Sequence, residues 1–582
     1  MKHNITQSLS WLHTWAGLIM GWALVAIFLT GTLAMFDKEI NVWMQPEVPA
    51  QTVDREQAVT TAINHLRSNH ADESAWQVAL PSERSPRLAV SAGEQQGGGG
   101  GRGNAMTTLD PATGEVIKPR ETAGGNFFFR FHYTLHFPRN IGVWVVGFMA
   151  MAMLAAIVSG IVIHKKFFKE FFTFRPNKGQ RSWLDFHNAS GVLLLPFHIM
   201  ITYTGLVIFF LIYMPAPMDA LFNGDRQAYQ AAMRGEGGER PQQEAGRGGE
   251  RGAPGGQADG ERAAVRNEAR PDAPRGELAQ RGQERAPRGE GMDERGPRGE
   301  RPQAPRVPLV DRTDEIDFMG LIARAEADMG ELSGFNLKRS ANGDAVFEAR
   351  PVMGNIIELT KGRSMSLNAL TGEVVRPVPE STGASWVQRV MAGLHFAQFG
   401  GYPMRWVYFI CGLISTAMMA GGLILFTVKR RRRYAKESRG VRFGYEFIER
   451  VNIAIVAGLM IASVGLLWAN RLLPVELAAR PNAEVNVFFA LWGLSFVHAS
   501  LRPWMKAWRE QLWIGGALML ALPLANLLGG VSLFGQGSSL YLELCTMLIG
   551  VLTLVAAWRT GQAGEYVSDA RKQRAAKEEL AC

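Results

Sequence analysis

The sequence predicts a multi-span α-helical membrane protein with two small α+β domains outside the membrane. Two observations predict this fold class: apolar runs near the length of a bilayer span, and long polar segments between some of them. A third is an internal repeat within residues 1–430. We count eight apolar runs, at 11–36, 141–163, 184–213, 404–428, 451–470, 483–500, 511–528 and 540–558. The first run is too long, and lacks the small-residue cleavage site, to be a removed signal peptide.

The basic residues predict the orientation. The net charge is +9, and Lys and Arg gather in the short loops after the second, fourth and sixth runs and in the tail after the eighth. The positive-inside rule then places these loops and the N-terminus in the cytoplasm. Segments 37–138 and 214–400 fall outside, in the periplasm if the membrane is a bacterial inner membrane. The charge therefore indicates topology, and we expect lipid and no nucleic acid as a partner.

The cysteines exclude some kinds of site. Cys411 and Cys545 lie in apolar runs and Cys582 is the C-terminal residue, so none lies in an external segment. We therefore expect no disulfide and no cysteine-based metal site there.

The first four runs form a duplicated unit. "WLHTWAGLIMGWALVAIFLTG" (11–31) aligns without gaps on "DFHNASGVLLLPFHIMITYTG" (185–205), which matches His13 with His187. "TTLDPATGEVIKPRE" resembles "MSLNALTGEVVRPVPE", and two "LHF" segments place His136 opposite His395. Each half then reads helix, external domain, amphipathic segment, helix. A parallel repeat of this kind predicts a pseudo-two-fold axis along the membrane normal.

Helical spacing, short strand-like pieces and turn signals predict one α+β unit in each external segment. Residues 234–306 are rich in Gly, Arg, Glu and Pro and predict a disordered insert in the second. The last four runs show no repeat and predict a separate bundle. The expected organisation is a first span at 1–36, a first external domain at 37–138, spans two and three at 139–213, a second external domain at 214–400, span four at 401–430, the bundle at 441–560 and a cytoplasmic tail at 561–582.

Six histidines lie in or beside the first four spans. An ionisable side chain within a membrane span is a functional hypothesis by default, and neutral imidazole binds haem iron, zinc or copper. A porphyrin between helices needs a histidine from each of two helices and small residues beside it. His13 has Gly17 four residues later, and His187 has Gly191. The six candidates are His13, His136, His164, His187, His198 and His395.

Their spacing predicts sites at two depths. On a straight helix, the eleven residues from His187 to His198 correspond to about 16.5 Å of rise and about 20° of rotation. This suits two stacked redox centres, or alternatively a proton relay. A relay would usually recruit Asp or Glu, and the interior of the first four spans offers neither.

On the outer side, His136 and His395 precede spans two and four in the matched "LHF" segments. His132 lies four residues before His136, so a small-metal site is the alternative there. His164, at the inner end of span two, is a secondary candidate for the inner site.

The arrangement "WLHTWAG…LTG", "DPATGEV", "LHF", "DFHNASG…PFHIMITYTG" and "LHFAQFGG" resembles the PepSY-associated transmembrane proteins, which include iron-regulated inner-membrane ferrisiderophore reductases. The resemblance covers about residues 1–430. It implies that the membrane histidines bind b-type haem and that the external PepSY units face the periplasm. The insert and the last four spans depart from the family pattern.

We therefore expect a ferric-chelate reductase of the bacterial inner membrane with two b-type haems. A quinol or a cytoplasmic reductase would reduce an inner haem near His13 and His187. An outer haem near His198, His136 or His395 would then reduce a ferric siderophore or another ferric chelate. The alternative is a non-catalytic PepSY membrane module that binds a peptide, a protease or an envelope partner.

Overall fold

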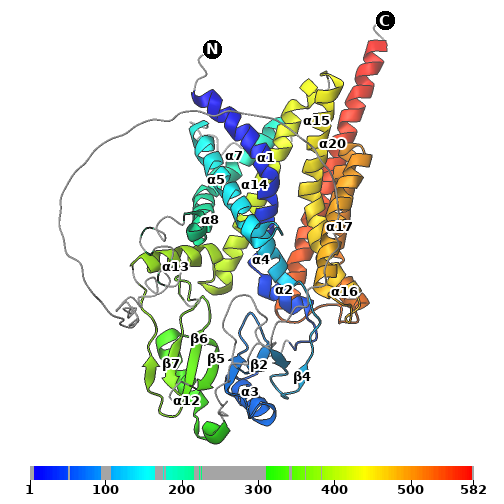
Figure 1. Cartoon of the computed structure of the whole chain (residues 1–582). Helices are drawn as coiled ribbons and strands as arrows, with labels where there is room; N and C mark the ends of the chain where they lie inside the picture. Colours follow the sequence, from blue (N-terminus) through cyan, green and yellow to red (C-terminus); the bar gives the residue numbers. More distant parts are fainter. Residues whose placement is uncertain are drawn as a thin grey trace, which may run out of the picture. The chain divides into compact units, whose positions relative to one another are not determined.

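The structure is a computed structural model of the chain (Figure 1). It describes residues 5–49, 53–93, 106–163, 175, 179–214, 220, 222, 225, 228, 310–339, 344–354, 356–360, 362–381, 383–434 and 436–579. The insert expected at 234–306 and the candidate ligand His164 lie outside these residues.

The membrane-spanning part agrees with the eight predicted spans. The described residues contain six helices long and apolar enough to cross a membrane, and up to eight spans if each of two bent helix pairs counts as one. The six are α1 (Ile5–Ala34), α5 (Arg139–Ile163), α14 (Gly401–Tyr434), the continuous run of α15 (Arg439–Ile453), η2 (Ala454–Gly458) and α16 (Leu459–Leu472), α17 (Arg480–Leu501) and α20 (Ser538–Glu579). The bent pairs are α7 (Gln180–Leu193) with α8 (Leu195–Ile208), and α18 (Trp504–Leu520) with α19 (Leu522–Leu528). The predicted fold class is confirmed.

Both bends occur at a proline in the first turn of the second helix. Pro196 follows Leu195 at the start of α8, and the axes of α7 and α8 differ by 65°. Pro523 stands in the same place in α19, where the bend is 56°. Proline has no N–H to continue the helix and clashes with the preceding turn, so the axis breaks. His187 and His198 therefore lie on two differently directed helices, and the predicted rise and rotation for a straight helix do not apply to them.

The two segments that the sequence predicts outside the membrane share one antiparallel sheet. Its strand order is β4-β3-β2-β1-β5-β6-β7-β8, which reads symmetrically about the junction of β1 and β5. There Trp76 pairs with Leu337, and both are buried in one core with Leu66, Phe335 and Phe347. The strands are β1 (Ala75–Ala79), β2 (Leu88–Ala92), β3 (Thr107–Leu109), β4 (Val116–Ile117), β5 (Leu332–Arg339), β6 (Ala345–Pro351), β7 (Met365–Asn368) and β8 (Val374–Arg376). The helices α3 (Arg55–Asn69) and α12 (Phe318–Met329) contribute to this core.

The repeat is visible in the turns of the sheet. The Asp110 carboxylate accepts hydrogen bonds from the backbone N–H groups of Ala112 and Thr113, between β3 and β4. The Asn368 side chain accepts them from Leu370 and Thr371, between β7 and β8. Such turns need a short side-chain acceptor at their first position, which explains the matched "DPATG" and "NALTG" motifs.

Short helices connect the sheet with the spans. They are α2 (Asp37–Met44), α4 (Gly124–Thr134), α9 (Phe210–Tyr213), η1 (Val310–Glu315) and α13 (Gly383–Phe396). Arg84, between β1 and β2, donates to the Glu39 carboxylate at 2.7 Å and to the Met35 carbonyl at 3.1 Å, just beyond the end of α1. We therefore call this end of the helices the sheet end, and the opposite end, where α1 begins, the far end.

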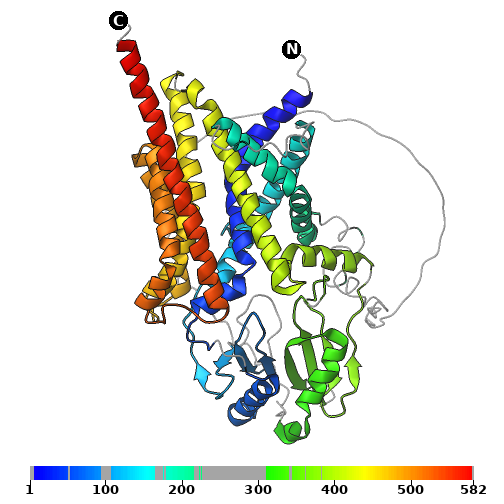
Figure 2. The same cartoon turned by 180° about the vertical axis from the view of Figure 1, so that it is seen from behind.

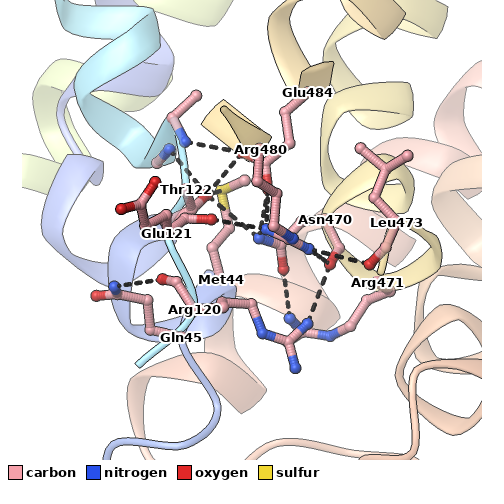
Figure 3. Close-up of polar contacts among 12 residues, drawn as sticks. Met44, Gln45, Arg120, Glu121, Thr122, Asn470, Arg471, Leu473, Arg480 and Glu484 are labelled. Atoms are coloured by element: carbon pink, nitrogen blue, oxygen red, sulfur yellow. Dashed lines mark hydrogen bonds and ion pairs between the residues drawn. The ribbon is translucent and has the colours of Figure 1, made fainter. Parts of the chain in front are cut away.

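The C-terminal helices pack on one another beside α14 (Figures 1 and 2). A buried polar network fixes them to the duplicated part at the sheet end (Figure 3). Arg480 and Glu484, one turn apart on α17, form an ion pair, and both side chains have no exposed surface. Glu484 also accepts from the hydroxyl of Thr122, just before α4, at 2.8 Å. Arg120 donates to the carbonyl of Asn470 on α16 at 3.0 Å.

Candidate functional site

Two pairs of histidines meet in the duplicated part. His13 on α1 and His187 on α7 have ring centres 6.3 Å apart, and we call them the far-end pair. The Nδ1 atom of His13 lies 3.0 Å from the carbonyl oxygen of Ala156 on α5. The Nδ1 atom of His187 lies 3.0 Å from the carbonyl oxygen of Met418 on α14. The pairing that the repeat predicted for His13 and His187 is present.

The second pair differs from the prediction. The ring centre of His395 on α13 lies 6.0 Å from that of His132 on α4, and we call these two the sheet-end pair. The Nδ1 atom of His132 lies 2.8 Å from the carbonyl oxygen of Ile27, and that of His395 lies 3.1 Å from the carbonyl oxygen of Ile201. The sequence predicts His132 only as part of a small-metal site with His136.

The contacts show that His132 is the repeat partner of His395. Ile27 and Ile201, which receive the two hydrogen bonds, are matched in the gap-free alignment of 11–31 on 185–205. The matched glycines next to them also face the two rings. A Cβ on Gly31 would lie 2.5 Å from His132 Nδ1, and one on Gly205 would lie 3.0 Å from His395 Cε1. Only a residue without a side chain leaves room for either imidazole.

Glycines also face the far-end pair, but they are not the ones that the sequence suggested. A Cβ on Gly160 of α5 would lie 3.4 Å from His13 Cε1, and one on Gly422 of α14 would lie 3.1 Å from His187 Cε1. By contrast, a Cβ on Gly17 would meet nothing within 4 Å. The small residues that accommodate these rings therefore lie on the neighbouring helices.

His136 lies outside the pairs. Helix α4 ends at Thr134, and Leu135 and His136 follow with positive φ angles of 50° and 64°. His395, in contrast, lies within α13. The His136 ring packs against Phe489 of α17, with ring centres 5.1 Å apart. Burial, and secondarily the charge of Arg130, lower the pKa of His136. The predicted pairing of His136 with His395 is therefore not found, because the "LHF" match ignores where each helix ends.

His198 is a third kind of histidine. It is 2% exposed, and its Nε2 atom lies 2.8 Å from the hydroxyl oxygen of Ser415 on α14. That hydroxyl donates to the carbonyl of Cys411 at 2.7 Å, so the His198 nitrogen donates to it. Among the described residues, the ring contacts of His198 are with Phe28 and Phe197. The hydrogen-bond partner of His198 is therefore a hydroxyl, and its ring contacts within the described part of the chain are with phenylalanines.

Each pair could hold a haem iron, with one imidazole from each of two helices. The ring centres, 6.3 Å and 6.0 Å apart, leave room for one metal ion between the two rings, since a ring centre lies about 3 Å from a metal that its nitrogen binds. Nδ1 donates to a carbonyl in all four rings, which leaves the lone pair on Nε2. This is the usual outer contact of a metal-bound histidine.

The donor set distinguishes haem from a bare metal ion. Structural zinc takes four ligands, and catalytic zinc takes three from the protein. Within the described part of the chain, no three His, Cys, Asp or Glu side chains come together in a metal-binding group. A haem iron needs only two protein ligands, because the porphyrin supplies the other four. The described residues therefore give no support to the small-metal alternative at His132 and His136.

Comparison with known proteins gives one match. A family model described as "PepSY-associated TM region" matches residues 10–429. No curated protein matches the chain significantly. The matched region contains the shared sheet and both histidine pairs, and it ends before the C-terminal bundle.

Proposed function

Because the chain belongs to the family of proteins with a PepSY-associated TM region, we propose that it is a b-type haem protein that carries electrons across the bacterial inner membrane to ferric iron. The acceptor is a ferric siderophore or another ferric chelate on the periplasmic side. The activity is that of a ferric-chelate reductase, and Fe(II) is its product.

One observation carries this proposal: the two histidine pairs lie at two depths along α1, because His13 belongs to one pair and the carbonyl of Ile27 accepts a hydrogen bond from the other. His13 and His187 would hold one haem, and His132 and His395 the second. Haem, when bound, supplies reversible one-electron chemistry. Two haems at two depths would give a path across most of the membrane.

The chain's own residues orient the ligands and keep the sites neutral. The four Nδ1 contacts fix the ring planes through backbone carbonyls of α1, α5, α8 and α14. Helices α1, α5, α8 and α14, whose carbonyls accept these four contacts, contain no Asp or Glu. Apolar side chains around the helices exclude water, and such burial helps to set the reduction potential of a haem.

The direction of transfer follows from the basic loops. Lys and Arg gather at the far end, as in "KRRRRY" at the end of α14, which supports a cytoplasmic location for that end. The sheet would then face the periplasm, where the chelate is reduced by one electron per iron. Hard oxygen ligands hold Fe(II) less tightly than Fe(III), so reduction releases the metal.

An optical spectrum of the detergent-purified protein tests the proposal. With haem available in the host, we expect a Soret band in the oxidised protein and an α-band after dithionite. His187→Ala and His395→Ala should each remove one centre, whereas His65→Ala, in the sheet domain, should remove none. Absence of both bands would overturn the proposal and favour the alternative, a non-catalytic PepSY module.

A further inference from the structure

A large apolar cavity separates the duplicated part from the C-terminal bundle. Its volume is about 1860 Å³, and its walls come from α1 and α14 on one side and from α16, α18 and α20 on the other. Apolar side chains that line these walls include Val25, Leu413, Ala417, Val464, Leu512 and Ile549. The family match ends at residue 429, so the wall formed by α16, α18 and α20 lies outside the matched region.

The cavity is as long as the hydrocarbon layer of a membrane. Both Ser538 and Thr560 of α20 line it. At 1.5 Å per residue, the stretch between them corresponds to about 33 Å, close to the thickness of a bilayer core. Its occupant should therefore be a long apolar chain.

A buried carboxylate lies at the far end of the cavity. Glu449 of α15 lines it and is 4% exposed. Its Oε1 atom lies 3.4 Å from Nη2 of Arg431. Its Oε2 atom is buried and makes no hydrogen bond of good geometry among the described residues, with the hydroxyl of Thr427 and the indole of Trp508 beside the carboxylate. A buried carboxylate oxygen without a donor is costly, so it marks a place where a ligand hydroxyl would be stabilised.

Glu449 also reaches the aqueous side. It lines a second, smaller cavity of about 340 Å³ together with Arg442, Arg450 and Pro503. A proton taken up by this carboxylate can therefore leave towards the far end. The guanidinium of Arg431, 3.7 Å from the ring centre of Trp504, stands between the two cavities and holds the carboxylate in place.

The same cavity lies next to the far-end pair. Phe186 and Gly421 line it, and each is adjacent in sequence to a residue at the far-end pair. Phe186 precedes His187, and Gly422 faces the His187 ring, with 3.1 Å between an ideal Cβ and Cε1. The residue immediately before His187 therefore lines the cavity.

We propose that this cavity binds an isoprenoid quinol and that Glu449 accepts a proton from its hydroxyl. This inference rests on the proposed function, because the electrons need an acceptor at His13 and His187. Oxidation of one quinol to quinone breaks two O–H bonds and releases two protons and two electrons. Each proton passes to Glu449 and then to water through the smaller cavity. The electrons leave one at a time towards the far-end pair and reduce two ferric ions.

A quinol fits this site better than a phospholipid. Its head group is neutral and carries two hydroxyl donors on opposite sides of the ring, and Glu449 Oε2 can accept a hydrogen bond from the one that faces it. A phospholipid would place an anionic phosphate beside a carboxylate, and like charges in a low-dielectric site repel.

The test measures quinone binding separately from electron transfer. The purified full-length protein is extracted with organic solvent for bound quinone, and titrated with ubiquinone-1 while tryptophan fluorescence is followed, since Trp504 and Trp508 line the cavity. We expect bound quinone and saturable quenching. Ala417→Phe, which fills part of the cavity, should weaken ubiquinone-1 binding at least tenfold.

Glu449→Gln should leave binding within about threefold and slow reduction of the haem by ubiquinol-1 at least tenfold in stopped-flow measurements. Glu437→Gln, an exposed carboxylate at the same end, is the matched control and should change neither. Dithionite-reduced spectra of all variants report whether the fold and the haems are intact.

The outcomes separate the two proposals. Haem that dithionite reduces but ubiquinol-1 does not would overturn the inference and leave the proposed function standing. Extracted phospholipid without quinone, or quenching that does not saturate, would also overturn it. Bound quinone in a protein without haem would support the binding site and overturn the electron-transfer step together with the proposed function.

Discussion

The duplicated part and the C-terminal bundle bury different kinds of polar groups. In the duplicated part, four of the imidazoles between helices are held by backbone carbonyls, as at His132 and His395. In the bundle they are charged and amide side chains that contact one another. Arg480 pairs with Glu484, and Arg471 of α16 donates to Asn526 of α19 at 2.8 Å.

The two kinds of buried polar group suit two roles, ligand binding and the attachment of one helix to another. A neutral imidazole costs less to bury than an ion, and its second nitrogen keeps a lone pair for a metal. The donors and acceptors of the buried Arg480–Glu484 pair are taken up by each other and by neighbouring segments, so the pair fixes which helices meet. The bundle's charges are thus suited to hold α16 and α17 against α2 and α4, while the histidines are suited to bind.

Breaking the ion pair should have the largest effect on stability. Glu484→Ala leaves the Arg480 guanidinium buried without its counter-charge, which typically costs about 3–5 kcal/mol. Chemical unfolding of the detergent-purified protein, followed by tryptophan fluorescence, measures this loss. Glu476→Ala, at an exposed position between α16 and α17, is the control. A loss below about 1 kcal/mol for Glu484→Ala would show that the network does not fasten the bundle.

Two variants test whether His132 or His136 is the ligand that pairs with His395. His132→Ala should remove one of two haems, and the α-band of the reduced protein should fall by about half. His136→Ala should leave the band unchanged, because its ring packs against Phe489 and lies outside the pair. The reverse result would support the pairing of His136 with His395 that the "LHF" match predicts, and it would refute the sheet-end pair.

A glycine variant tests how tightly the sheet-end pair is packed. Gly31→Ala places a methyl group 2.5 Å from His132 Nδ1, so the ring must move. We expect a cost of about 2 kcal/mol from overpacking, together with a weaker α-band. Gly17→Ala, where a Cβ meets nothing within 4 Å, should change neither unfolding nor spectrum. Equal behaviour of the two variants would argue against close packing around His132.

The smallest effect should come from the contact of His198. Ser415→Ala removes the hydroxyl that lies 2.8 Å from His198 Nε2 and leaves this nitrogen without its acceptor, at a cost of about 1 kcal/mol. Ser500→Ala in α17 removes a hydroxyl that bonds only its own helix at Phe496, and is the control. Chemical unfolding compares them. If Ser415→Ala instead removed a haem, His198 would belong to the ligand set.

The spans could be predicted from the lengths of the apolar runs. The repeat and the far-end pair could be predicted from the gap-free alignment of the two halves. The partner of His395 could not be predicted. It depends on helix α4 ending at Thr134 in a left-handed turn, and the "LHF" letters do not show helix ends. A signal for His132 did exist: Gly31 and Gly205 are matched in the repeat and leave room for one ring each.

The fastening network could not be predicted either. Thr122 and Glu484 are far apart in sequence, and no periodicity relates them. The 65° bend before Pro196 was likewise visible only as a proline, so its effect on the depth of His198 was missed. The pattern of apolar residues indicates which side chains are buried, but it does not indicate which buried polar groups contact one another.

The shared sheet bears on how such a chain can be assembled. The strand order is palindromic, and β1 and β5 meet at its centre as two copies of one strand would meet across a dimer axis. An isologous interface of this kind is what a homodimer with two-fold symmetry presents. One gene encoding half of the unit could therefore have produced the same sheet and the same histidine pairs from two separate polypeptides. Fusion into one chain then allowed each half to change independently, as His198, whose repeat position in the first half is Leu24, already shows.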